Sequence, residues 1–555
     1  MLFTLSFTLL AACSGASENS ESPTTTSRVS DSTSTAPATT PPTTIPADPY
    51  ATPGWLTSEN AKPGSPEWKI SKPVPGAKPV DSPGSIEGFA STTSARPGET
   101  VTLYVATDAE SWHVEAYRMG WYQGDQARLI WQSEKMGPSW QFKVLTDRQT
   151  RMARTQWSPS LTFDIDDAWP PGSYLLKLVS GSGEAHYVPL TVRRDTASAS
   201  LVVVSAVTTW QAYNPWGVCS LYECFDGARR SRATVVSFDR PYAASYNWGS
   251  ADLLTHELPL ISLIEELGID TAYVTDIDLH TSGLPDSSEP NSVFANRTAL
   301  LTTGHDEYYS TAMRTTLENA RAAGINLAFF GANAVYRHIR LEPNDEGVDL
   351  RQMANYRTAS ADPITTTDPS QSTVQWRNAP LSRPESELIG VQYFGAGVNA
   401  PMILVDTDNW VFADVGVSNG KSLPGLVTIE ADELGPAYLE PDNLQVLASS
   451  PTRYAGRTYN QAMTYYTAES GAGVFATGTI GWIISLDAIG WGDESVTKVV
   501  RAITANILRA FAAGPSGQMH PSVGNADRYR RVVSPETSPA TESPSSTIAF
   551  DFGGL

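Results

Sequence analysis

A histidine and two carboxylates stand together in the segment Gly304-His305-Asp306-Glu307. If the chain is extended here, alternate side chains point the same way, so His305 and Glu307 would share one face. An imidazole beside a carboxylate suits metal ligation or general acid–base catalysis. The acidic residues could instead complement the dipole of a helix that begins just downstream. The segment by itself leaves both interpretations open.

Asn333 follows a different apolar run and poses a similar choice. Its side-chain amide could donate a hydrogen bond to an oxyanion that develops during a reaction. It could equally be a turn residue at the end of a strand.

The hydrophobic pattern between residues 198 and 513 indicates which elements must position these side chains. Apolar runs predict strands over 201–207, 271–275, 298–302 and 325–330. Helical spacing predicts helices over 252–267, downstream of Ser310 as the N-cap, and over 495–512. Strands that alternate with helices in this order predict an α/β fold, a parallel sheet with crossover helices.

The expected strand ends bring the candidate residues to one place. In open parallel sheets, ligands bind beyond the carboxyl ends of the strands. His305 and Glu307 follow the third predicted strand, and Asn333 follows the fourth. One polar site at this edge of the sheet is therefore expected.

The region 86–195 has a different pattern. Short alternating runs, separated by turns such as Arg96-Pro97-Gly98-Glu99, predict an all-β sandwich. Catalytic residue types do not gather there, which favours a packing or recognition module.

Both ends of the chain have a composition that does not build a core. Residues 1–13 are apolar and close with Leu10-Ala11-Ala12-Cys13, which resembles the lipobox of bacterial lipoproteins, although the cysteine could be incidental. The Ser/Thr/Pro-rich residues 14–80 predict a disordered linker, and residues 514–555 a disordered tail. We therefore expect an extracytoplasmic protein, anchored through a lipid on Cys13 or secreted.

Cys219 and Cys224 are the two remaining cysteines. Outside the cytoplasm, a pair with this spacing is more often a small disulfide loop than a metal clip. A disulfide is expected.

Charge and composition exclude several classes of protein. Asp and Glu number 59 against 38 Lys and Arg, which gives a formal net charge of −21. A sequence-independent nucleic-acid binder needs a basic face, and so does a polybasic membrane contact. Hydrophobic residues make up 41% of the chain, which is enough for folded cores. We expect no nucleic-acid partner, and membrane contact only through the lipid.

Five motifs in order along the chain resemble the large (β) subunit of N,N-dimethylformamidase. They are QAYNPWG with SLY, RRSRATVVSFDRPY, YVTDIDLH, GHDEYYS and NLAFFGANAVYRHIRLEP. The resemblance extends over about residues 201–511, and the sandwich region fits the preceding domain of that subunit. It implies a glutamine-amidotransferase-like core for the second domain, residues 198–513.

The resemblance also implies a mononuclear non-haem iron held by two tyrosines and one glutamate. Carried over by motif, the metal ligands are Tyr213, Tyr242 and Glu307, with Tyr222 in reserve. The catalytic helpers are His305, Asn333 and Glu430. Phenolate and carboxylate are hard anionic donors, which favour a highly charged cation over zinc or copper.

Two functions remain in competition. The first is an iron-dependent hydrolase of a linear amide, formamidase-like, which acts on a small amide and could need a small subunit or a homo-oligomer. The second is a lipid-anchored binding protein for a glycan or peptide, without catalytic activity. Its support is the lipid anchor and the tryptophans Trp112, Trp121 and Trp140, which could be exposed.

Overall fold

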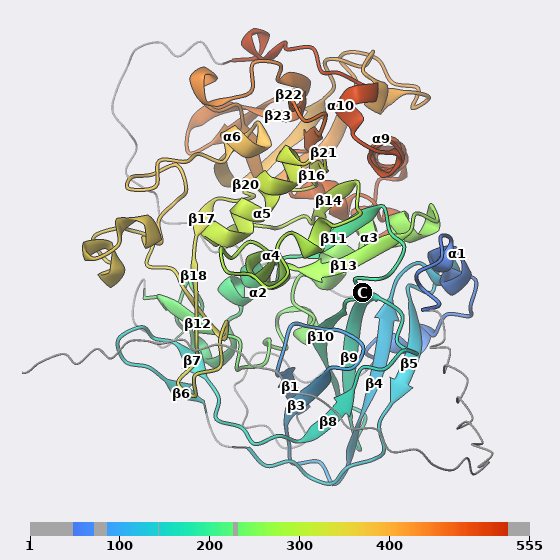
Figure 1. Ribbon diagram of the computed structural model, residues 1–555, viewed down its shortest axis with the longest axis vertical. Coiled ribbons are helices and arrows are strands. Elements are labelled where there is room, and N and C mark those ends of the chain that lie inside the picture. Colours follow the sequence, from blue (N-terminus) through green and yellow to red (C-terminus); the bar gives the residue numbers. More distant parts are fainter. Residues whose placement is uncertain (1–47, 72–85, 142–143, 226–230, 531–555) are drawn as a thin grey trace, which may run out of the picture. The chain divides into compact units, whose positions relative to one another are not determined.

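The computed structural model describes residues 48–71, 86–141, 144–225 and 231–530 (Figure 1). The described residues cluster as one compact unit. The lipobox with Cys13, most of the expected linker and the tail beyond residue 530 lie outside the described residues. Within the described ranges, no helix has both the length and the apolar character that crossing a membrane requires.

Residues 48–71 are ordered, although their region was expected to be a linker. Helix α1 (Trp55–Asn60) and the 3₁₀ turn Pro66–Trp68 bury their tryptophans and Leu56. The Trp55 indole N–H donates to the carbonyl of Ser198 at 2.8 Å. The segment still contains Ser, Thr and Pro, but its buried aromatic residues supply the apolar surface that holds it in place.

Two small sheets form the region expected to be a sandwich. One contains β1 (Ile86–Ala90), β3 (Thr100–Thr107) and β8 (Leu161–Asp164). The other contains, in spatial order, β2 (Ser94–Ala95), β10 (Ala185–Val192), β9 (Gly172–Ser180), β4 (Trp112–Met119) and β5 (Ala127–Gln132). All pairs except β2–β10 are antiparallel. Val101, Leu103, Val114 and Leu176 belong to one buried cluster that joins the two sheets.

The central sheet begins with the parallel strands expected from the sequence. They are β13 (Thr271–Thr275), β11 (Leu201–Ser205), β14 (Ala299–Thr302), β16 (Asn326–Phe329) and β24 (Gly473–Ala476), side by side in this order. Figure 1 labels the first four of these strands. Every adjacent pair is parallel. β11 lies between β13 and β14, so the loops after β11 and β14 leave in opposite directions and open the crevice in which such folds bind ligands.

The sheet then continues with antiparallel strands, so it is mixed and not wholly parallel as expected. These strands are β20 (Gln392–Ile403), β21 (Ser422–Glu433), β22 (Gln445–Tyr454) and β23 (Arg457–Thr467). A two-residue turn joins β22 to β23, with φ of 47° at Ala455 and 78° at Gly456, which matches the twist of a tight hairpin. Glu430 lies on β21, and the antiparallel half therefore supplies part of the site.

Helices follow the parallel strands and cover the sheet. They are α2 (Val207–Tyr213), α3 (Leu258–Glu266), α4 (Asp276–Ser282), α5 (Thr311–Ala322) and α9 (Glu494–Ala513). The Ser310 hydroxyl accepts from the Met313 N–H at 3.2 Å, which confirms the expected cap of α5. The helix expected over 252–267 is divided, because a π-helical turn, Leu253–Glu257, precedes α3, which has Pro259 in its first turn.

Short strands complete the loops around the site. β15 (Tyr308–Tyr309) pairs in parallel with β17 (Arg337–His338). A small sheet contains β12 (Val235–Ser237), β19 (Gln352–Ala354) and β18 (Arg340–Glu342). β6 (Leu145–Thr146) pairs with β7 (Ala153–Arg154).

Candidate active site

Glu307 is the centre of a buried polar cluster at the carboxyl end of the parallel strands. Its Oε2 accepts from the Tyr213 hydroxyl at 2.8 Å and from the Tyr222 hydroxyl at 2.5 Å. Its Oε1 accepts from Arg337 Nε at 2.9 Å. The residue is only 1% exposed. Three oxygens from separate segments therefore converge at one point, while the Arg337 guanidinium donates to the other carboxylate oxygen of Glu307.

Local structure brings the two tyrosines to Glu307. Tyr213 is the last residue of α2, and Thr209 of the same helix accepts the Glu307 backbone N–H on its hydroxyl at 3.0 Å. Tyr222 lies in the loop that the Cys219–Cys224 disulfide closes, so the expected disulfide is confirmed. The two phenol rings stack with centroids 4.1 Å apart.

Arg240 holds the segment of residues 211–219, which contains Tyr213, in place. The residue is 1% exposed, and its guanidinium donates to the backbone carbonyls of residues 211, 214, 216 and 219 at 2.9–3.2 Å. Its Nε donates to the Gln211 side-chain oxygen at 3.0 Å. All of its N–H groups can thus be satisfied by neutral acceptors of one segment. That segment contains Tyr213 and one cysteine of the Tyr222 loop.

Glu430 and Asn333 form a second part of the site. Asn333 Nδ2 donates to Glu430 Oε2 at 2.9 Å, and its backbone N–H donates to Asp432 Oδ1 at 2.8 Å. Asn333 has φ of 61°, a left-handed conformation that Asn tolerates better than most residues. Ile429 has φ of 67°, which is strained for a β-branched residue and distorts β21 immediately before Glu430.

His305 joins the two parts. Its Nε2 lies 3.9 Å from both Glu307 Oε2 and Glu430 Oε2, and its ring contacts that of Tyr213. On the other side, its Nδ1 lies 3.5 Å from Asp252 Oδ2, and Asp252 Oδ1 lies 3.2 Å from His256 Nδ1. Asp252 was missed by the sequence analysis. It precedes the π-helical turn, and no local pattern distinguishes it from other helix-start aspartates.

Burial and neighbouring charges shift the pKa values of the cluster's members. Burial opposes the charged form of His305, but the Asp252 contact and the carboxylates of Glu430 and Glu307 outweigh it and raise its pKa to about 9. Burial raises the pKa of Glu430 to about 7, against the opposing charge of His305. Burial also raises the pKa of Asp432 to about 8.

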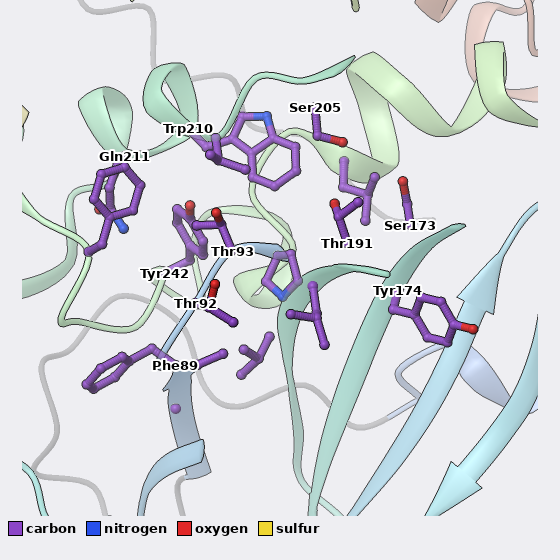
Figure 2. Close-up of a pocket in the computed structure, with 18 of the residues that line it drawn as sticks. Phe89, Thr92, Thr93, Ser173, Tyr174, Thr191, Ser205, Trp210, Gln211 and Tyr242 are labelled. Atoms are coloured by element: carbon purple, nitrogen blue, oxygen red, sulfur yellow. The ribbon is translucent and has the colours of Figure 1, made fainter. Parts of the chain in front are cut away.

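Tyr242 lies apart from Glu307, although the motif transfer favoured it as a ligand. Its ring packs against those of Trp210 and Tyr246. Figure 2 shows Tyr242 and Trp210 beside a cavity of about 40 Å³ that Phe89 and Ser173 also line. Tyr222, the reserve choice, occupies the place at Glu307 because the disulfide loop folds back over Tyr213.

The residues present fit a hard metal cation. Burial and the Glu307 charge hold the pKa values of Tyr213 and Tyr222 well above the ordinary value, so these phenols ionise only beside a strong positive charge. Among the described residues, the buried atoms His305 Nε2 and Asn333 Oδ1 have no hydrogen-bond partner. The same residues contain no metal-binding group of three or more His, Cys, Asp or Glu.

A comparison with known protein families matches most of the chain. Residues 113–497 match a family model described as N,N-dimethylformamidase beta subunit-like, C-terminal. No curated protein matches the chain.

Two solved structures share short, weak likenesses with the chain. A β-glucosidase from Listeria innocua in complex with isofagomine is 16% identical over 24% of this chain and 21% of its own, with a TM-score of 0.12. A cycloisomaltooligosaccharide glucanotransferase from Paenibacillus sp. complexed with cycloisomaltoheptaose is 8% identical over 46% of this chain and 45% of its own, with a TM-score of 0.15. This chain thus spans less than half the length of either protein, and likenesses this slight do not bear on fold or function.

Proposed function

Because the chain belongs to the N,N-dimethylformamidase beta subunit-like family, we propose that it is a metal-dependent hydrolase of a carbon–nitrogen amide bond. The observation that carries the proposal is the convergence of the Tyr213 and Tyr222 hydroxyls on Glu307, beside the Asn333–Glu430 pair. The family is named after an amidase, and the site combines a hard donor set with proton-transfer groups. The substrate is proposed to be a small linear amide.

In this proposal Tyr213, Tyr222 and Glu307 hold a mononuclear non-haem iron. Tyr222 replaces Tyr242 in the proposed ligand set because the Tyr222 hydroxyl donates to Glu307 and the Tyr242 hydroxyl does not. Bound iron supplies Lewis acidity, which polarises a carbonyl and lowers the pKa of a water. Arg337 keeps one Glu307 oxygen occupied and leaves the other facing the phenols.

Glu430 moves the proton in the proposed reaction. It accepts a proton from the water whose oxygen attacks the carbonyl carbon, and returns it to the nitrogen as the C–N bond breaks, which yields a carboxylic acid and an amine. A carboxyl group with a pKa of about 7 is suited to both directions of transfer at neutral pH. Asn333 Nδ2 fixes the carboxylate for this task.

His305 orients the reactants. Its Nδ1 faces Asp252, so a protonated imidazole directs its Nε2–H into the space between Glu307 and Glu430. That N–H can donate to the substrate carbonyl oxygen as negative charge develops on it. Asp252 thus holds the ring, as the carboxylate partner of a catalytic histidine does.

The competing proposal, a lipid-anchored glycan- or peptide-binding protein, loses part of its support. Trp112 is 2% exposed and belongs to the sandwich core, and Trp121 is half-buried. Trp140 is 77% exposed and stays available for such a ligand. Extracytoplasmic location with a lipid on Cys13 is compatible with either function, and we retain it as a proposal.

One experiment separates the two proposals. The full chain is produced with iron, and bound iron, visible absorption and amine release from a panel of small formamides and acetamides are measured. We expect about one iron per chain, a phenolate-to-iron absorption band and turnover of at least one amide. A colourless protein that retains no iron and binds glycans through Trp140 would support the second function instead.

A further inference from the structure

We infer that Tyr308 is a positioning residue for Tyr222, and that it makes the two tyrosines of the site chemically unequal. The Tyr308 hydroxyl donates to the Tyr222 hydroxyl oxygen at 2.9 Å. The inference rests on the proposed function in one respect, since the difference it describes is between Tyr213 and Tyr222 as ligands of the proposed metal. None of the motif-based site assignments includes Tyr308.

The position of the Tyr308 hydroxyl is fixed by its backbone. The residue is fully buried and lies opposite Arg337 in the β15–β17 pair. Its carbonyl accepts from the Thr208 hydroxyl at 2.9 Å. Burial and these backbone contacts restrict the positions from which the ring can present its oxygen to Tyr222.

A cation lies over the same tyrosine. The Arg357 guanidinium carbon is 4.5 Å from the Tyr222 ring centroid, and Arg357 Nη2 donates to the Leu221 carbonyl at 2.8 Å. A positive charge over the ring favours its electron-rich, ionised form. Among the described residues, the contacts of Tyr213 are different: its hydroxyl donates to Glu307, and its ring faces those of Tyr222 and His305.

These contacts give the two phenols different chemistry after they ionise. Each phenol donates its only proton to Glu307 in the present structure. When that proton is lost, the Tyr222 oxygen still accepts from Tyr308, and a hydrogen bond to an anionic oxygen is stronger than one to a neutral oxygen. Such a bond stabilises the filled orbitals of the phenolate, so Tyr222 becomes the weaker electron donor of the two.

The adjacent residue provides a matched control. Tyr309 is as deeply buried as Tyr308, lies on the same short strand and donates its hydroxyl to Asp306 Oδ2 at 2.5 Å. Tyr308→Phe and Tyr309→Phe each remove one buried hydroxyl, but only Tyr308→Phe removes a hydroxyl that is hydrogen-bonded to Tyr222.

The test compares both variants with the wild-type full chain, loaded with iron. We expect Tyr308→Phe to move the phenolate-to-iron band to longer wavelength and to weaken iron retention by roughly 10–100-fold, the usual effect of losing an outer hydrogen-bond partner. Tyr309→Phe should leave the band where it is in the wild type. A band that stays in place in Tyr308→Phe, or that moves equally in both variants, overturns the inference.

A metal-free measurement keeps this inference separate from the proposed function. In protein with ¹³Cζ-labelled tyrosine, the Tyr222 signal, assigned through Tyr222→Phe, should shift in Tyr308→Phe and not in Tyr309→Phe. If iron-loaded wild type shows no band but this signal shifts, the iron proposal fails and the pairing of Tyr308 with Tyr222 stands. If the signal does not shift, the pairing itself is wrong.

Discussion

Two buried ionic clusters in this molecule are built on opposite plans. The first, which we call the junction cluster, joins the sandwich to the α/β region through Arg118 on β4 and Glu265 on α3. Both side chains are fully buried and form a two-pronged ion pair, with Arg118 Nη2 2.6 Å from Glu265 Oε1 and Nη1 3.1 Å from Oε2. Tyr273, Asn60 and the backbone N–H of residue 121 also donate to Glu265.

The second cluster, around Glu307 and Glu430, is incompletely paired. Arg337 faces Glu307, and His305 faces Glu307, Glu430 and Asp252, while buried atoms of His305 and Asn333 have no hydrogen-bond partner among the described residues. Buried charge that is fully matched serves structure, because removing either partner leaves a costly isolated ion. Buried charge that is left partly unmatched is suited to a ligand that completes it.

The largest expected effect is on turnover. Glu430→Gln keeps the size and hydrogen bonding of the side chain but cannot accept the proton, so kcat should fall about 10²–10⁴-fold. Stability should stay unchanged or rise, because one acid leaves an acid-rich cluster. Steady-state amine release and urea unfolding on the same samples check this. If Glu430→Gln remains active on an amide that the wild type cleaves, the base must be sought at Asp432 or Glu433.

The junction cluster should show the reverse behaviour. Glu265→Gln leaves Arg118 buried without its counter-ion and should reduce the free energy of unfolding by about 3–5 kcal/mol. At temperatures where the variant is folded, its kcat should equal that of the wild type.

The neighbouring Glu266 is the matched control for that variant. It forms a partly exposed pair with Arg501, so Glu266→Gln should cost less than about 1 kcal/mol. Denaturant unfolding measures the free energy of unfolding of both variants. Equal losses in Glu265→Gln and Glu266→Gln would contradict the distinction between buried matched pairs and solvent-screened pairs.

Glu257 provides an intermediate case, a buried carboxyl that accepts hydrogen bonds from Ser205, Ala206 and Thr303. Burial raises its pKa from 4.5 to about 8. Between these two values the folded chain binds more protons than the unfolded chain, so the contribution of Glu257 to stability is present at low pH and is lost as pH rises through about 8.

The Glu257→Gln variant tests that sign. Its free energy of unfolding, relative to wild type, should increase by on the order of 2–4 kcal/mol between pH 5 and pH 8. Unfolding curves at several pH values measure the difference. A constant difference would mean that Glu257 is ionised in the folded protein.

A smaller effect on turnover than that of Glu430→Gln is expected at Asp252. Asp252→Asn keeps the shape of the side chain but no longer favours a protonated His305, so kcat should fall roughly 10–100-fold while iron content is retained. If this variant loses iron, Asp252 instead helps to position the proposed metal ligands. If kcat is unchanged, Asp252 has no role in turnover.

The sequence was sufficient to predict the parts of the fold that depend on local pattern. The apolar runs at β11, β13, β14 and β16, the Ser310 cap and the Cys219–Cys224 pairing are all present. The antiparallel strands β20 to β23 were not predicted. Their half-exposed faces and the bulges between β20 and β21 weaken any simple periodicity.

The sequence was better at predicting which residues lie at the candidate site than which atoms they contact. Strand order alone brings His305, Glu307 and Asn333 to one edge, and the structure has them there. Which tyrosine besides Tyr213 contacts Glu307 depends on how a disulfide loop folds over α2, which motif position does not encode. Asp252 and Arg337 were missed because their roles arise from contacts between distant segments.

The disulfide loop gives the chain an order of maturation. Tyr222 lies within a ring of residues 219–224 that closes only when both thiols have been oxidised. Cytosolic glutathione and thioredoxin keep such thiols reduced. A chain with both thiols reduced would hold Tyr222 on an open loop, with more freedom for its hydroxyl than the closed ring allows. If the chain is exported, as we propose, the ring would close only in the compartment where the proposed site is to act.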